Sequence, residues 1–339
     1  MSDFRVASGH RSHRPVKIRY WLLWLNLCLL APAEAAWYQQ QRDIMGTRIS
    51  VDLWHEDRAT ADLCAEKVFD EMHRIDELMS PYIDSSELSF INNNAAISAV
   101  SISEEMAYLV ERSLYFSDIS AGAFDITYAS IGYAYDYRKQ LQPSDEEVLS
   151  KLPAINYRNI KLANNKIGFS VSGVRIDLGG IAKGYAVDRA ISILRLCSIE
   201  QAMVSAGGDS RIIGDKQGRP WIIGIQHPRD DKQLALRLPL SDSAISTSGD
   251  YERFYIDQGN RVHHIINPAT GRSAKGSWST TVTGADAMTT DALSTTIFVL
   301  GAEAGMALVE SLNGIDAIII DNHGKMHYSS GLQTPEAAQ

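Results

Sequence analysis

The second half of the chain places the tightest limit on its fold, because short apolar or alternating segments recur there beyond residue 200. Gly, Pro, Asn or Asp separates most of these segments, a pattern that is typical of β-strands. One helical stretch interrupts them, from about residue 286 to 312, with a break expected at Gly301. The predicted strands are QAMVSAGG, PWIIGIQ, LALRLPL, VHHIIN, STTVTG and DAIIIDN.

The first half adds helices at irregular intervals. A strand is predicted at 48–54 and a helix at 59–79, and the apolar stripe of that helix comprises Cys64, Val68, Met72, Ile75 and Met79. A second helix begins after Ser103 and ends at Gly122, and a third begins near Gly180. Because strands and helices do not alternate regularly, we expect an α+β fold with mixed or antiparallel sheets and packed helices, not a doubly wound parallel sheet.

The N-terminal segment has the features of an export signal. A basic leader precedes the apolar run WLLWLNLCLLA, and the small residues of Pro-Ala-Glu-Ala-Ala follow. This order predicts a signal peptide over residues 1–35. The mature chain, 36–339, is long enough for one large domain or two modest ones. The apolar run is short for a membrane span, and an uncleaved anchor is the alternative.

The charge balance narrows the choice of partners. The formal net charge is −9, which favours neither nucleic acid nor an anionic membrane surface as a partner. Local positive groups or a metal ion could still attract an anionic substrate.

Cysteine content says little about the fold. The mature chain would keep only Cys64 and Cys197, both at apolar positions of predicted helices. Two buried thiols are the simplest interpretation, and two cysteines without clustered histidines do not indicate a structural zinc site. A disulfide is permitted in an oxidising compartment, but the spacing does not require one.

The segment RIDLGGIAKGYAVD, Arg175 to Asp188, is the first candidate for chemistry. A strand ends at Asp177, two glycines turn the chain, and a helix opens whose free backbone N–H groups can attract an anion. Lys183 in the first turn opposes the helix dipole, which is tolerable if the lysine faces an anion. The alternative is a tight turn with a solvated lysine. The sequence is neither G-x-G-x-x-G nor a Walker A motif.

Two further segments could contribute to the same chemistry. Asp291 and Thr295 are four residues apart, so a helix would place them on one face as oxygen ligands for a hard cation such as Mg²⁺. The alternative for this segment is ordinary helix capping. His263 and His264 are adjacent, so on a strand at most one of them can join a given site, and a lone histidine is more often structural.

Nine short segments can be taken together in chain order: Met45–Thr47, Met79–Tyr82, Ser86–Leu88, Gly122–Thr127, Asp177–Asp188, Ala206–Asp209, Ser248–Tyr251, His264–Gly271 and Ala285–Thr295. They resemble the corresponding segments of the ApbE-type FAD:protein FMN transferases. Together they extend over about residues 40–330, nearly the whole mature chain. The resemblance implies an ApbE-like, T-fold-related architecture, with 36–339 as a single catalytic domain of one or two lobes.

The resemblance also implies a reaction and its residues. FMN would move from the substrate FAD to a Ser or Thr hydroxyl of a target protein, with Mg²⁺ as cofactor and AMP as the leaving group. His264 matches the histidine proposed to assist proton transfer, and Asp291, Thr295 and the carbonyl of Gly180 match the metal ligands. The flavin contacts fall on Met45, Tyr82, Ala123, Phe124, Asp125, Asp177, Lys183 and Ile266. Among these, Tyr82 and Phe124 would offer aromatic surface, and the position of Lys183 varies within the family.

Location and partners follow from the same resemblance. We expect a periplasmic protein, in some association with the inner membrane, whose acceptor is a flavoprotein subunit of a membrane redox complex. Two alternatives are an FAD-binding carrier without transfer activity and an FAD pyrophosphatase that yields FMN and AMP. Retention of Asp291, Thr295 and His264 argues against the carrier.

Overall fold

Eight strands form the central sheet, and every neighbouring pair in it is antiparallel. Their order is β1 (Ala36–Ile44), β2 (Thr47–His55), β6 (Ala202–Ala206), β7 (Asp209–Ile213), β10 (Ala244–Gly249), β15 (Ser277–Gly284), β16 (Asp316–Asp321) and β17 (Met326–Tyr328). The α+β class expected from the sequence is confirmed, since helices pack against this sheet without a parallel βαβ repeat.

The computed structural model describes residues 1, 3 and 35–333. Apart from residues 1, 3 and 35, the predicted signal peptide lies outside the described residues. From Ala35 onward the chain forms one compact unit. Among the described residues, no helix is both long enough and apolar enough to cross a membrane.

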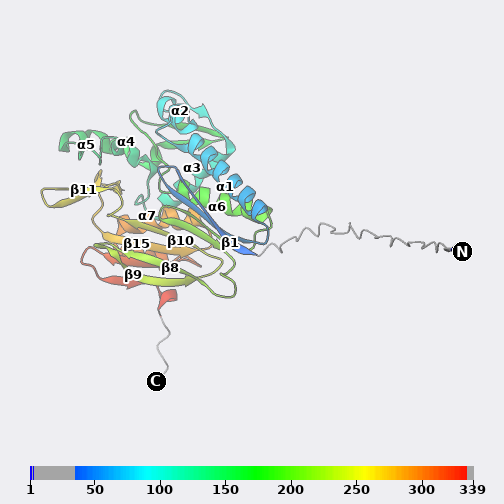
Figure 1. Ribbon diagram of the computed structural model, residues 1–339. Helices are drawn as coiled ribbons and strands as arrows, with labels where there is room; N and C mark the ends of the chain where they lie inside the picture. Colours follow the sequence, from blue (N-terminus) through cyan, green and yellow to red (C-terminus); the bar gives the residue numbers. More distant parts are fainter. Residues whose placement is uncertain (2, 4–34, 334–339) are drawn as a thin grey trace, which may run out of the picture. The chain divides into compact units, whose positions relative to one another are not determined.

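Four helices pack against the sheet: α1 (Arg58–Met79), α6 (Ala182–Leu196), α7 (Ala287–Leu300) and α8 (Ala302–Glu310). Figure 1 shows α1 and α6 beside each other. The predicted stripe of α1 is buried as expected, because its residues recur every three or four positions and meet the sheet. The predicted break at Gly301 is also confirmed: its φ is +78°, a conformation that glycine adopts without strain, and it separates α7 from α8.

Shorter elements surround this body. The remaining helices are α2 (Glu87–Asn94), α3 (Glu104–Ile119), α4 (Ala129–Gly132) and α5 (Asp145–Lys151). A three-stranded sheet contains β3 (Val100–Ser101), β5 (Lys166–Phe169) and β4 (Ile160–Ala163). Three two-stranded sheets pair β8 (Trp221–His227) with β9 (Asp230–Leu240), β11 (Phe254–Asp257) with β12 (Asn260–His263), and β13 (Ile266–Asn267) with β14 (Arg272–Ser273).

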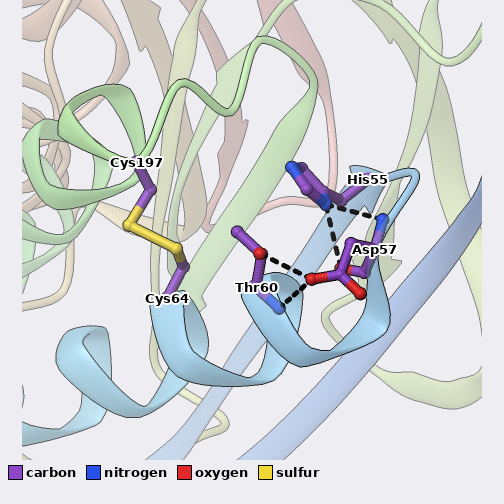
Figure 2. The surroundings of a disulfide bond; sticks show 5 residues. All are labelled: His55, Asp57, Thr60, Cys64 and Cys197. Carbon is purple, nitrogen blue, oxygen red and sulfur yellow. Dashed lines mark hydrogen bonds between the residues drawn. A yellow bond between two sulfur atoms is a disulfide. The ribbon is translucent and has the colours of Figure 1, made fainter.

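The structure corrects the expectation of two free buried thiols. Cys64 in α1 and Cys197, immediately after α6, form a disulfide with their Cα atoms 6.3 Å apart. Figure 2 shows this bond near the start of α1, where Asp57 caps the helix by accepting a hydrogen bond from the Thr60 amide at 2.9 Å. The bond joins residues 133 positions apart, a closure that sequence spacing could not reveal.

One predicted strand is wrong. The segment VHHIIN is not continuous, because β12 ends at His263 and β13 begins at Ile266. His264 therefore lies in the short connection between two small sheets, and not on a strand as expected.

Candidate active site

The Arg175–Asp188 segment meets the start of α7. At Gly184 in α6, the amide donates a hydrogen bond to the Asp291 carboxylate at 2.9 Å. A Cβ at this position would overlap the backbone carbonyl of Ala287. Only glycine therefore lets α6 and α7 approach this closely, and the approach carries Asp291 to the loop before α6.

The three predicted metal ligands lie together at this junction. A Cβ built on Gly180 would be 3.4 Å from the Thr295 hydroxyl oxygen, so the turn before α6 contacts the Asp291 face of α7. Ser248 adds another hydroxyl, 3.3 Å from that of Thr295. No group of three His, Cys, Asp or Glu side chains that could hold a metal occurs among the described residues. An ion would depend on hydroxyl and carbonyl oxygens beside carboxylates, a hard donor set that fits Mg²⁺.

Lys183 is held by protein carboxylates. Its ammonium group hydrogen-bonds to Asp209 and lies 3.5 Å from Asp291, and both carboxylates are almost fully buried. Burial lowers the pKa of Lys183, but the charges of Asp209 and Asp291 outweigh this effect and leave the pKa above its usual value. Burial and the charge of Asp209 raise the pKa of Asp291, and Lys183 partly offsets this. The lysine thus faces an anion, as its position near the helix start suggested, but that anion belongs to the protein.

Sequence reasoning did not assign a role to Asp209. It begins β7, directly after the Gly207–Gly208 turn, and is only 2% exposed. The signal was present in the segment Ala206–Asp209, which contributed to the family resemblance. Its partnership with Lys183 depends on the packing of α6 on β7.

Asp177 lies at the other end of the same loop. Its carboxylate accepts a hydrogen bond from the Gly179 amide at 2.6 Å, which fixes the turn. Burial raises the pKa of Asp177, against the charges of Arg253 and Lys183, which lower it. Tyr82, in the loop after α1, is 80% exposed and so offers the aromatic surface expected of it.

Two residues that match flavin contacts, Phe124 and Asp125, are buried. Phe124 is 4% exposed and packs edge-on against Phe116 with ring centroids 6.0 Å apart. Its ring also contacts the Gly180 turn and therefore offers little free surface. Both Asp125 oxygens are engaged: one accepts from the Thr127 amide at 2.8 Å, and the other from the Tyr157 amide at 2.7 Å. Asp125 therefore caps a short 3₁₀ helix. Because its carboxylate is buried and both oxygens already accept hydrogen bonds, the side chain has a structural role.

The remaining residues that match flavin contacts of the family are Ala123, Met45 and Ile266. Ala123 is half-buried beside Phe124, and Met45 is half-buried at the β1–β2 turn with a positive φ of 55°. Ile266 is 5% exposed in a cluster with Tyr135 and other apolar side chains, so its side chain presents little surface to a ligand.

His264 has a buried ring nitrogen that makes no hydrogen bond to the described residues. Its amide donates to the Arg253 carbonyl at 3.2 Å, while the side-chain Nδ1 is buried and has no hydrogen-bond partner among the described residues. Burial, followed by the charges of His263, Arg253 and Lys183, lowers the pKa of His264 to about 3. The imidazole is therefore neutral at pH 7, the form that can accept a proton.

His263 behaves differently from its neighbour. It is 2% exposed, with Nε2 2.8 Å from the Ala274 carbonyl and Nδ1 accepting from the Ile265 amide at 3.3 Å. Both ring nitrogens of His263 have partners within the fold, whereas Nδ1 of His264 has none among the described residues. The two histidines thus differ, although they do not lie on one strand as expected, because β12 ends at His263.

Arg253 is a second residue that sequence reasoning missed. Its guanidinium donates to the Gly46 carbonyl in the β1–β2 turn at 3.3 Å, and its charge acts on both Asp177 and His264. Arg253 therefore links the segments that contain Gly46, Asp177 and His264, by one hydrogen bond and by its charge. No local sequence pattern indicated this role.

The chain matches the model of the ApbE family over residues 45–319. It is 30% identical over 334 residues to a Vibrio cholerae protein named FAD:protein FMN transferase, covering 94% of this chain and 99% of that protein. A Treponema pallidum protein of the same name is 28% identical, with 92% of this chain and 94% of that protein covered.

Solved structures show the same architecture. The crystal structure of the ApbE protein from Thermotoga maritima superposes with a TM-score of 0.81 at 34% identity, covering 87% of this chain and 98% of that one. The flavin transferase ApbE from Vibrio cholerae gives a TM-score of 0.78 at 28% identity, with the same coverage.

Proposed function

This chain belongs to the ApbE family, and on that premise we propose that it is a magnesium-dependent FAD:protein FMN transferase. Its substrates are FAD and an extracytoplasmic redox protein that carries an acceptor Thr or Ser. One observation carries the proposal: Gly180, Asp291 and Thr295 lie together, and within residues 35–333 the Nδ1 atom of the neutral His264 has no hydrogen-bond partner.

The proposed transfer is a single displacement at phosphorus. The acceptor hydroxyl oxygen forms a bond to the FMN phosphorus of FAD, and the bond between that phosphorus and the bridging oxygen breaks. The hydroxyl proton passes to His264, and AMP departs with the bridging oxygen. The products are a phosphoester-linked FMN on the acceptor and free AMP. Such reactions depend chiefly on positioning and charge neutralisation, which buried, pre-arranged side chains can provide.

The residues have separate tasks in this proposal. Asp291, Thr295 and the Gly180 carbonyl would hold Mg²⁺, which supplies neutralisation of pyrophosphate charge when bound. His264 accepts the proton, a contribution typically worth about 10²–10⁴-fold in rate. The positive charges of Arg253 and Lys183 contribute to the low pKa of His264. A pyrophosphate anion beside these two residues would offset their contribution to that pKa.

We also propose that the protein is exported to the periplasm. The predicted signal peptide supports it, and so does the disulfide between Cys64 and Cys197, because such bonds persist in oxidising compartments. A flavoprotein subunit of a membrane redox complex would then be an accessible acceptor.

The experiment is incubation of the purified mature protein with FAD, Mg²⁺ and the extracytoplasmic domain of such a subunit, followed by intact-mass analysis. A covalent FMN increment on Thr or Ser, together with equimolar AMP, is the expected result. Free FMN and AMP with an unmodified acceptor would establish the pyrophosphatase. Tight FAD binding without turnover would establish the carrier.

A further inference from the structure

The hairpin formed by β11 and β12 grows directly out of the candidate site. Arg253 immediately precedes β11, and His264 immediately follows β12. The two residues face each other at the base, where the His264 amide donates to the Arg253 carbonyl at 3.2 Å. Figure 1 shows the hairpin extending away from the central sheet.

The register of the hairpin determines which backbone groups point outward. Asp257 pairs with Asn260 across a two-residue turn, and Tyr255 pairs with Val262. The bond between His264 and Arg253 continues the same alternation of hydrogen-bonded pairs. The residues between them on β11, Phe254 and Ile256, therefore direct their N–H and C=O groups away from β12.

This outer edge of β11 is open. In the part of the chain that the structure describes, the amides of Phe254 and Ile256 have no hydrogen-bond partner. The corresponding edge of β12 is closed at His263, whose amide donates to the Ser273 hydroxyl at 3.0 Å. An open strand edge is a template for another strand.

The side chains of β11 divide between two faces. Tyr255 is 7% exposed and packs with Val262 in the apolar cluster that includes Tyr135. Phe254 and Ile256 are 38% and 54% exposed. The hairpin is thus anchored by one face and presents apolar side chains and unpaired amides together.

We propose that β11 is the docking edge for the acceptor protein, which adds an extended segment alongside Phe254–Asp257 and so brings its hydroxyl residue to His264. This rests on the proposed function. The occupant is a polypeptide strand because only a backbone repeats donors and acceptors at two-residue spacing to match Phe254 and Ile256. The continuity of β11 with the candidate site supports the acceptor protein as the occupant of this edge. A segment that pairs with β11 and continues past Phe254 would reach Arg253 and His264.

The decisive variants are Ile256→Pro and its matched control Ile256→Ala. Both replace the isoleucine side chain with a smaller one, but only proline removes the outward N–H, and that N–H is not used in the β11–β12 ladder. We expect the KM for the acceptor domain to be roughly tenfold higher in Ile256→Pro than in Ile256→Ala, the effect of about one lost hydrogen bond. FAD affinity, measured by flavin fluorescence, should be equal in both.

A second measurement does not depend on the variants. Hydrogen exchange of the wild-type enzyme is followed with and without an acceptor domain whose target Thr is replaced by Val. Slower exchange across 254–257 is expected on binding. Equal acceptor KM values for the two variants, together with unchanged exchange at 254–257, would overturn the docking edge while FMN transfer by the wild type stands. If the wild type forms no FMN ester on the acceptor, the proposed function itself fails and the docking proposal falls with it.

Discussion

The ammonium group of Lys183 lies 3.5 Å from the carboxylate of Asp291, a residue predicted to hold Mg²⁺. The same ammonium hydrogen-bonds to Asp209, so one cation serves two buried carboxylates at the start of α6. Removing one partner of a buried ion pair leaves an uncompensated charge, typically at a cost of about 3–5 kcal/mol. Lys183 therefore stabilises a cluster of negative charge that a divalent cation could also neutralise.

Replacing Lys183 with Met should expose this relationship. We expect Lys183→Met to lower the melting temperature in the absence of Mg²⁺, because Asp209 and Asp291 then repel each other without a counter-charge. Added Mg²⁺ should raise that temperature more than it does for the wild type, as measured by scanning calorimetry. Lys67→Met, at an exposed position of α1, is the control and should respond like the wild type. A Mg²⁺ effect equal in all three proteins would contradict the predicted metal site.

Asp291→Asn tests the metal assignment through activity. Asparagine can still accept the Gly184 hydrogen bond, so the α6–α7 junction should persist while the charge is lost. We expect Mg²⁺-dependent FMN transfer to fall by about 10²-fold or more, and FAD binding to weaken much less. The control is Asp70→Asn, at an exposed position of α1. Full activity in Asp291→Asn would show that the assignment is wrong.

His264 should make the stability of the protein depend on pH. Its pKa falls from the usual 6.5 to about 3 on folding, so the unfolded chain binds the proton more readily. The stability that neutral His264 contributes is complete above pH 6.5 and is lost as pH falls toward 3, with a slope of at most about 1.4 kcal/mol per pH unit. Relative to His264→Gln, the wild type should lose stability in urea titrations between pH 7 and 4.5. Parallel curves for the two proteins would contradict the low pKa.

Gly184→Ala tests the close approach of two helices. The added methyl group would overlap the Ala287 carbonyl, a backbone atom that can yield only if α7 moves. We expect marked loss of thermal stability and of transfer activity, because Asp291 moves with α7. Gly305→Ala in α8 is the comparison, since its methyl group would mainly meet the Ile297 side chain. It should reduce stability less and leave activity intact; equal effects on activity would count against the helix junction.

Loss of the disulfide should lower the stability of the protein without abolishing its transfer activity. Reduction, or the double variant Cys64→Ser with Cys197→Ser, opens a closure of 133 residues and should lower the unfolding free energy by roughly 2–5 kcal/mol. Cys197 follows the C-terminal end of α6, whereas Lys183 lies in its first turn, so transfer at 25 °C should persist. Melting curves with and without reductant measure the first effect, and an unchanged melting temperature would contradict it.

Local sequence patterns were sufficient to predict the long helices and several strands of the central sheet. The α1 stripe and the Gly301 break follow from periodicity and from glycine's access to positive φ, both of which depend on neighbouring residues alone. The long edge strand β1 was not predicted, because AWYQQQRDI mixes polar and apolar residues without clear alternation. The VHHIIN segment failed for the opposite reason: it has strand-forming residues, but pairing with separate partners divides it at His264.

The Arg175–Asp188 segment and the Asp286–Thr295 segment were both visible in the sequence, and so was the chemistry of their oxygen donors and backbone amides. Residue types and order along the chain determined that much, because capping, turns and ligand hardness are local properties. Only the tertiary structure decided that Lys183 would pair with Asp209 and Asp291, that Phe124 and Asp125 would be buried, and that Cys64 would reach Cys197. Those outcomes depend on which surfaces of α1, α6 and α7 meet across the sheet, and contacts between residues distant in sequence leave no local pattern.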